Sequence, residues 1–213
     1  MSGRLPQDVA SLEVDTPHGL ARVHLHIVDR PSAGLVLGHG AGGGVAAPDL
    51  VAATEAALAE EVSVALVEQP YRVAGRRSPA PARQLDAAWI AVVARLRERG
   101  LAGRPLVVGG RSSGGRVACR TIEATGAAGV LCLAFPLQPP RRRSGVVPPS
   151  RLHELEAVPV PVLVVQGRRD PFGIPPRSRA RTVVAVDGDH NLRTDPRAVT
   201  DAVRAWLRDT ILV

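Results

Sequence analysis

Short apolar segments alternate with longer helix-period segments along most of this chain, and this alternation limits the possible folds more than any other feature. The apolar segments are 34–40, 62–70, 105–110, 129–136, 160–167 and 181–186. The segments with helical spacing of apolar residues are 48–61, 82–99, 114–125 and 196–210. The pattern predicts a mostly parallel β-sheet with helices on both faces, which binds its ligands at the carboxyl ends of the strands.

The N-terminal region follows a different pattern. Residues 11–16 and 21–28 alternate between apolar and polar side chains, and a Pro-His-Gly turn joins them. This predicts an antiparallel strand pair at the start of the sheet. We find no internal repeat and no long linker, so residues 1–213 are expected to form a single domain. Two loops rich in proline and arginine, 70–81 and 136–151, follow strands and are expected at the ligand-binding edge.

Length and cysteine content exclude several classes of protein. The apolar stretches are far shorter than the roughly 18 residues of a membrane-spanning helix, and the N-terminus contains no apolar signal core. We therefore expect a cytoplasmic protein without a membrane partner. Cys119 and Cys132 are too few for a disulfide framework or a zinc cluster, and both are expected to pack in the core.

The chain is strongly basic, with a formal net charge of +7, and all 27 of its basic residues are arginine. Without lysine it has neither a Walker phosphate loop nor a Schiff-base amine. The arginines are scattered, and few aromatic residues are available to stack on bases. We therefore expect no nucleic-acid partner.

The most informative motif is "GGRSSGGR", in which Gly110 to Gly114 match G-x-S-x-G with Ser112 at the centre. A serine in a sharp turn between a strand and a helix is lifted above the sheet, and the flanking glycines remove side chains that would collide with neighbouring elements. The adjacent Ser113 does not fit, because Arg111 stands where the first glycine is required. Ser112 is therefore the candidate nucleophile, and a tight turn without chemistry is the alternative.

A nucleophilic serine needs a base and an acid that orients the base. Asp170 and His190 each follow a predicted strand, so both are expected at the same edge as Ser112. The order Ser, Asp, His is the one found in α/β-hydrolases. Taken singly, Asp170 fits a turn cap before Pro171, and His190 fits a surface turn. The order and the placement together favour a catalytic triad.

The segment "LVLGHGAGGG" predicts an oxyanion hole at the end of a strand. Backbone N–H groups near Ala41 are expected to face the serine, and the N–H of Ser113 is expected to supply the second donor. His39 is expected to be structural.

The same stretch also matches the dinucleotide-binding pattern G-x-G-x-x-G. In that pattern, an acid roughly 20 residues after the glycines binds the ribose. Glu68, the candidate acid, lies farther than this from Gly43, which weighs against the dinucleotide alternative.

The pieces "HGAGGG", "GGRSSGGR", "GRRDPFG" and "GDHNL" together resemble the α/β-hydrolase superfamily over residues 35–191. Within it, the chain is most similar to a small bacterial branch without a cap domain, near dienelactone-hydrolase-like proteins and the testis-expressed and NSL-complex hydrolase-like proteins. The resemblance implies the α/β-hydrolase fold without a cap, with Ser112 as nucleophile, His190 as base and Asp170 as acid. It also implies backbone oxyanion donors at Ala41 and Ser113.

These observations predict a serine hydrolase that cleaves a small ester or related acyl bond and needs no cofactor or metal. One alternative is a protein of the same fold that binds ligands or partners with little or no catalysis. Another, less favoured, is a dinucleotide-binding protein. The sequence leaves the acyl and alcohol groups of the substrate, the oligomeric state and the physiological role open.

Overall fold

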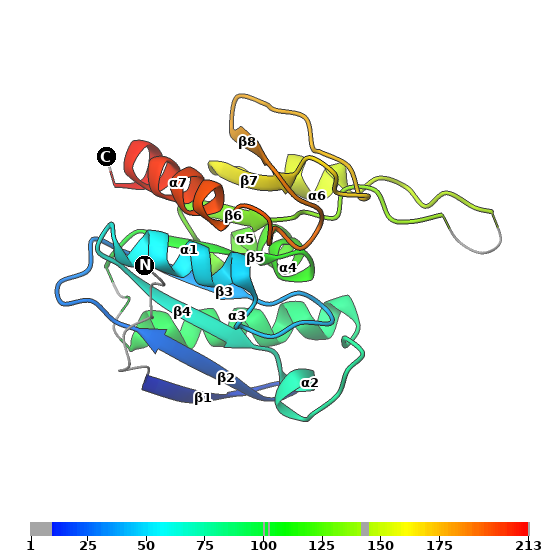
Figure 1. The fold of residues 1–213 in the computed structure, drawn as a ribbon. Coiled ribbons are helices and arrows are strands. Elements are labelled where there is room, and N and C mark those ends of the chain that lie inside the picture. The colour runs from blue at the N-terminus through cyan, green and yellow to red at the C-terminus, as the bar shows by residue number, and fades with distance from the viewer. Residues whose placement is uncertain (1–9, 100, 102, 142–144, 213) are drawn as a thin grey trace.

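Eight strands form one twisted sheet in the order β1-β2-β4-β3-β5-β6-β7-β8 (Figure 1). The computed structural model describes residues 10–99, 101, 103–141 and 145–212. The strands are β1 (Ala10–Thr16), β2 (Gly19–His26), β3 (Ala33–Gly38), β4 (Val62–Glu68), β5 (Leu106–Arg111), β6 (Gly129–Leu133), β7 (Val162–Gly167) and β8 (Arg181–Val186). β2 pairs antiparallel with both β1 and β4, and every pair from β4 to β8 is parallel. The predicted mostly parallel sheet with an antiparallel N-terminal pair is therefore confirmed.

Helices cover both faces of the sheet (Figure 1). One face carries α1 (Pro48–Leu58), α7 (Pro196–Trp206) and the π-helical turn Leu207–Ile211. The other face carries α3 (Ala82–Glu98), α4 (Ser113–Arg120), α5 (Ile122–Thr125) and α6 (Leu152–Glu156). The short helix α2 (Pro70–Val73) follows β4. The described residues form no cap domain over the carboxyl ends of the strands.

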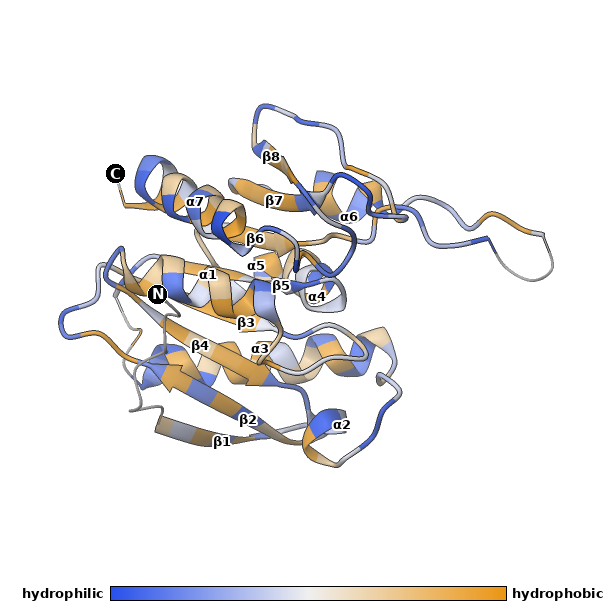
Figure 2. Ribbon diagram, in the orientation of Figure 1, coloured by the Kyte–Doolittle hydropathy of each residue, from blue (hydrophilic) through white to orange (hydrophobic). Residues whose placement is uncertain are grey.

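The central strands are apolar on both sides, because each side faces a layer of helices. In β3, Leu35 and Leu37 belong to the core under α1 and α7, whereas Val36 belongs to the core under α3 and α4. All three are fully buried. Figure 2 shows the same arrangement, with hydrophobic residues concentrated in the sheet and hydrophilic residues in the connecting loops. Burying an apolar side chain of this size contributes about 1.5–3 kcal/mol to the free energy of folding. The two core layers therefore hold β3 firmly, and with it the strand ends that carry the site.

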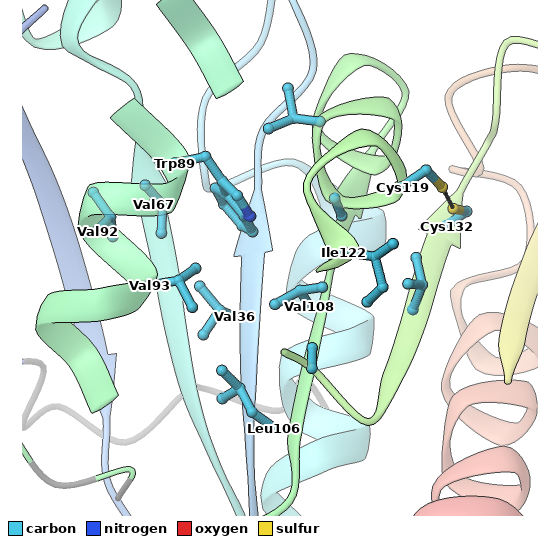
Figure 3. Close-up of a cluster of buried hydrophobic side chains, with 14 of the residues drawn as sticks. Val36, Val67, Trp89, Val92, Val93, Leu106, Val108, Cys119, Ile122 and Cys132 are labelled. Carbon is cyan, nitrogen blue, oxygen red and sulfur yellow. Dashed lines mark hydrogen bonds between the residues drawn. The ribbon is translucent and has the colours of Figure 1, made fainter. Parts of the chain in front are cut away.

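Trp89 is the largest side chain in the core beneath α3, and it is fully buried (Figure 3). It packs so closely on β3 that a Cβ at Gly38 would lie 3.1 Å from its ring. Cys119 on α4 and Cys132 on β6 face each other in the same core, with their sulfur atoms 3.7 Å apart. The contact with Cys119, together with burial, holds the pKa of the Cys132 thiol well above its usual value. The prediction that both cysteines pack in the core is confirmed.

Two details of the helices differ from the sequence prediction. The predicted helix over 114–125 is divided into α4 and α5 at Thr121, whose hydroxyl bonds back to the carbonyl of Val117. Such back-bonding competes with the regular helix. The two loops rich in proline and arginine contain or adjoin the short helices α2 and α6, which were not predicted. None of the helices in the described part of the chain combines the length and apolar character needed to span a bilayer.

Candidate active site

Ser112 occupies a strained turn between β5 and α4. Its φ of 50° and ψ of −105° lie outside the regions that non-glycine residues normally adopt. The flanking glycines make this turn possible, because a Cβ at Gly110 or at Gly114 would collide with the carbonyl oxygen of Gly38 on the neighbouring strand. The turn lifts the side chain of Ser112 into a cavity at the carboxyl ends of the strands.

The two other predicted residues lie next to this serine. His190 follows β8, and its Nε2 is 3.0 Å from Ser112 Oγ. Asp170 follows β7, and its Oδ2 is 2.8 Å from His190 Nδ1. The structure therefore brings together three side chains separated by up to 78 residues. This arrangement is possible because β5, β7 and β8 are parallel and end at the same edge.

Asp170 is held rigidly in a buried environment, with its side chain fully shielded from solvent. Oδ2 accepts a hydrogen bond from Gln166 Nε2 at 2.7 Å, and Oδ1 accepts one from the N–H of Phe172 at 2.9 Å. These two donors fix the position of the carboxylate, which in turn orients the imidazole. Phe172 also packs edge-on against His190, with ring centroids 4.5 Å apart.

Buried side chains hold the loop that follows β3 in place. His39 Nδ1 lies 2.8 Å from the carbonyl of Gly40, and its Nε2 accepts a hydrogen bond from the N–H of Gln69. Burial lowers the pKa of His39, and both of its nitrogens are occupied by backbone groups. The hydroxyl of Tyr71 donates to the carbonyl of Ala41 at 2.9 Å. The geometry thus fits the predicted structural role of His39.

A cavity of about 590 Å³ opens around Ser112 and His190. Glycines and alanines of the loop after β3 form one wall, and Pro48, Phe172 and Asn191 contribute to the others. Two arginines line it, Arg111 and Arg193. The described parts of 136–151 do not line this cavity, and 70–81 lines a separate one of about 360 Å³.

Comparison with known proteins identifies the family. The family described as alpha/beta hydrolase domain matches residues 31–207. The chain belongs to this alpha/beta hydrolase family. The match includes the strand ends that carry Ser112, Asp170 and His190, and the loop that contains Ala41.

Several solved structures share the fold at low sequence identity. An α/β serine hydrolase without a lid from Xanthomonas campestris is 18% identical, with a TM-score of 0.75 over 96% of this chain and 95% of that one. Est1E from Butyrivibrio proteoclasticus is 14% identical, with a TM-score of 0.75 over 93% of this chain and 98% of that one. Dienelactone hydrolase from Anabaena variabilis is 15% identical, with a TM-score of 0.73 over 98% of this chain and 100% of that one. A sequence comparison with curated proteins gives no significant match.

The geometry does not favour the dinucleotide alternative within this hydrolase fold. In that fingerprint the glycine-rich turn opens directly into a helix whose N-terminus holds the pyrophosphate. Here α1 begins only at Pro48, after several further residues. Glu68, the candidate ribose ligand, lies 3.5 Å from His24 and 3.9 Å from Arg22 on β2. Within the described residues, no group of three or more His, Cys, Asp or Glu side chains is placed to hold a metal ion.

Three residues at or next to the site were not predicted from the sequence: Gln166, Arg111 and Asp49, which contacts Arg111. Gln166 is the only polar side chain of β7, which is a detectable signal. It is fully buried, and its Nε2 also lies within hydrogen-bond distance of the carbonyls of Phe135 and Gly173. Arg111 pairs with Asp49, which lies 62 positions earlier in the chain, and no local pattern indicates that contact.

Proposed function

We propose that this alpha/beta hydrolase is a serine hydrolase that cleaves a small ester or related acyl bond. One observation carries the proposal: the continuous line of contacts from Ser112 Oγ to His190 Nε2 (3.0 Å), and from His190 Nδ1 to Asp170 Oδ2 (2.8 Å). A nucleophile bonded to a base that is itself oriented by an acid is the arrangement needed for acyl transfer.

The proposed reaction has two stages. Ser112 Oγ attacks the acyl carbon while His190 Nε2 takes the hydroxyl proton. Collapse of the tetrahedral intermediate breaks the bond to the alcohol, which leaves with the proton from His190. Water then attacks the acyl-enzyme, again losing a proton to His190, and the acid is released as Ser112 regains its proton. Asp170 holds the imidazole in the tautomer with a proton on Nδ1 and stabilises its charged form.

The negative charge of each tetrahedral intermediate requires preorganised donors. We assign these to the backbone N–H groups of Ala41 and Ser113. Ser113 begins α4, so its N–H belongs to the first turn of a helix, where no intrahelical acceptor is available. The bond from Tyr71 to the carbonyl of Ala41 supports the assignment, because it fixes the peptide units around the first donor.

The shape of the cavity supports a preference for substrates with short acyl groups. It is open, no cap domain of the described residues covers it, and one wall consists of glycine and alanine. A long acyl chain would find no apolar tunnel there. Est1E, a structural neighbour, has been solved with ferulic acid bound, which is consistent with an acyl substrate in this fold.

The competing candidate is a protein of this fold that binds without catalysis. Hydrolysis of short-chain p-nitrophenyl esters by the purified protein separates the two. We expect turnover by the wild type and by Ser113→Ala, which keeps its backbone N–H, and loss of turnover in Ser112→Ala. Equal rates for the wild type and Ser112→Ala across several acyl lengths would favour the binding protein.

A further inference from the structure

Arg111 joins three separate segments around Ser112. It is the last residue of β5, and its Nε lies 2.9 Å from Oδ2 of Asp49 in the first turn of α1. Its Nη2 donates to the carbonyl oxygen of His190 at 3.2 Å and to Oδ1 of Asn191 at 3.0 Å. One guanidinium therefore connects the nucleophile turn, the helix after the glycine loop, and the loop that carries His190.

The ion pair between Arg111 and Asp49 is largely shielded from water. The side chain of Arg111 is 13% exposed, and that of Asp49 is fully buried. Shielded charges interact more strongly than the exposed pairs typical of protein surfaces. A guanidinium offers several N–H donors in a rigid plane, so it can contact a carboxylate and two further acceptors at once, which a lysine cannot do with the same geometry.

The loop that carries His190 is anchored on either side of the histidine: the N–H of Arg169 donates to the carbonyl of Gly188, and the side chain of Leu192 is fully buried. The N–H of Asn191 bonds to Oδ1 of Asp189, and the N–H of Leu192 bonds to the carbonyl of Asp189, so both contacts are internal to the loop. Asp170 and Phe172 contact the ring of His190 and not its backbone. Among the described residues, Arg111 is the side chain that bonds to the backbone of His190. It connects that backbone to β5, the strand that precedes Ser112.

We propose that Arg111, held by Asp49, is a positioning residue that keeps His190 Nε2 within hydrogen-bond distance of Ser112 Oγ. It acts through the backbone of His190. Its effect on rate rests on the proposed function, whereas its effect on the position of the imidazole does not. A displacement of about 1 Å in a catalytic group can lower the rate roughly 100-fold, so a small shift of the His190 backbone is expected to reduce kcat.

The test combines three variants with a matched control. Arg111→Met removes the guanidinium, Arg111→Lys keeps a charge without the planar fork, and Arg111→Ala leaves space that added guanidinium can fill. Arg97→Met is the control, because Arg97 is also a partly buried arginine that clamps backbone carbonyls, those of Thr125 and Gly126, far from Ser112. Two quantities are measured: kcat and KM for a neutral short-chain ester, and the NMR signal of the His190 Nδ1 proton bonded to Asp170.

We expect Arg111→Met to lose about 10- to 100-fold, mainly in kcat, and to lose or broaden the His190 signal. Arg111→Lys should recover part of the rate, and guanidinium, but not an equal concentration of sodium chloride, should partly restore Arg111→Ala. Arg97→Met should keep both the wild-type kcat and the signal. A wild-type kcat and signal in Arg111→Met would overturn the proposal.

If the wild type hydrolyses no ester, the proposed function fails, and the NMR signal alone decides the positioning role. Loss of the His190 signal in Arg111→Met, with the signal retained in Arg97→Met, would still support it. An unchanged signal in Arg111→Met would overturn it.

Discussion

Gln166 donates through Nε2 to Oδ2 of Asp170 over 2.7 Å, and this is the same carboxylate oxygen that lies 2.8 Å from Nδ1 of His190. The amide therefore holds the same carboxylate oxygen that contacts the imidazole. We expect Gln166→Leu to lower kcat about 10-fold, because a hydrogen bond to a charged group contributes about 1.5–3 kcal/mol. Ester turnover measures the effect. Gln138→Leu removes an amide bonded to the carbonyl of Pro148, outside the cavity, and should keep the wild-type rate.

The acid can be tested by a change that preserves its shape. Asp170→Asn should lower kcat by about 10⁴-fold, because an amide favours the wrong tautomer of His190. Ser112→Ala and His190→Ala should each cost at least as much, and the double variant should be hardly worse than either, since the residues act as a unit. A near-normal kcat in Asp170→Asn would show that another group orients the histidine.

The glycines of the serine turn predict a contrast in stability. A Cβ at Gly114 would collide with the carbonyl oxygen of Gly38, which is backbone and cannot move aside cheaply. We expect Gly114→Ala to lower the free energy of unfolding by about 1–3 kcal/mol or more. At Gly43 a Cβ would meet nothing within 4 Å, so Gly43→Ala should be close to wild type. Urea unfolding measures both, and equal stability of the two variants would contradict the packing described for this turn.

The sequence indicated the parts of this molecule that depend on local patterns. Alternation of apolar and helical segments predicted the sheet, and the placement of Ser112, Asp170 and His190 at one edge could be predicted because each follows a predicted strand. Contacts between distant segments were not predictable in this way. The pairing of Arg111 with Asp49 depends on how the loop after β3 leads into α1 beside β5, and the single chain contains no pattern that specifies that packing.

Asp49 predicts a specific dependence of stability on pH. Burial raises the pKa of its carboxyl to about 6, although Arg111 opposes the shift. Because this pKa is higher than the roughly 3.9 of an unfolded aspartate, ionised Asp49 lowers stability above about pH 6, and the cost disappears as the pH falls towards about 4. The wild type should therefore gain about 2 kcal/mol relative to Asp49→Asn between about pH 7 and about pH 4.5. A constant difference in unfolding free energy between the wild type and Asp49→Asn over this range would show that the pKa of Asp49 is not raised.

Covalent labelling with a fluorophosphonate tests the central claim most directly, because it requires no guess about the substrate. The reagent reacts with a serine whose oxygen is activated by a base and whose developing charge is stabilised by an oxyanion hole. We expect the folded wild type to be labelled at Ser112 alone, as read by peptide mapping, and Ser113→Ala to be labelled equally well. His190→Ala should be labelled far more slowly, since the proton then has no acceptor. A folded protein that stays unlabelled at neutral pH, or one labelled at Ser113, would contradict the assignment of Ser112 as an activated nucleophile.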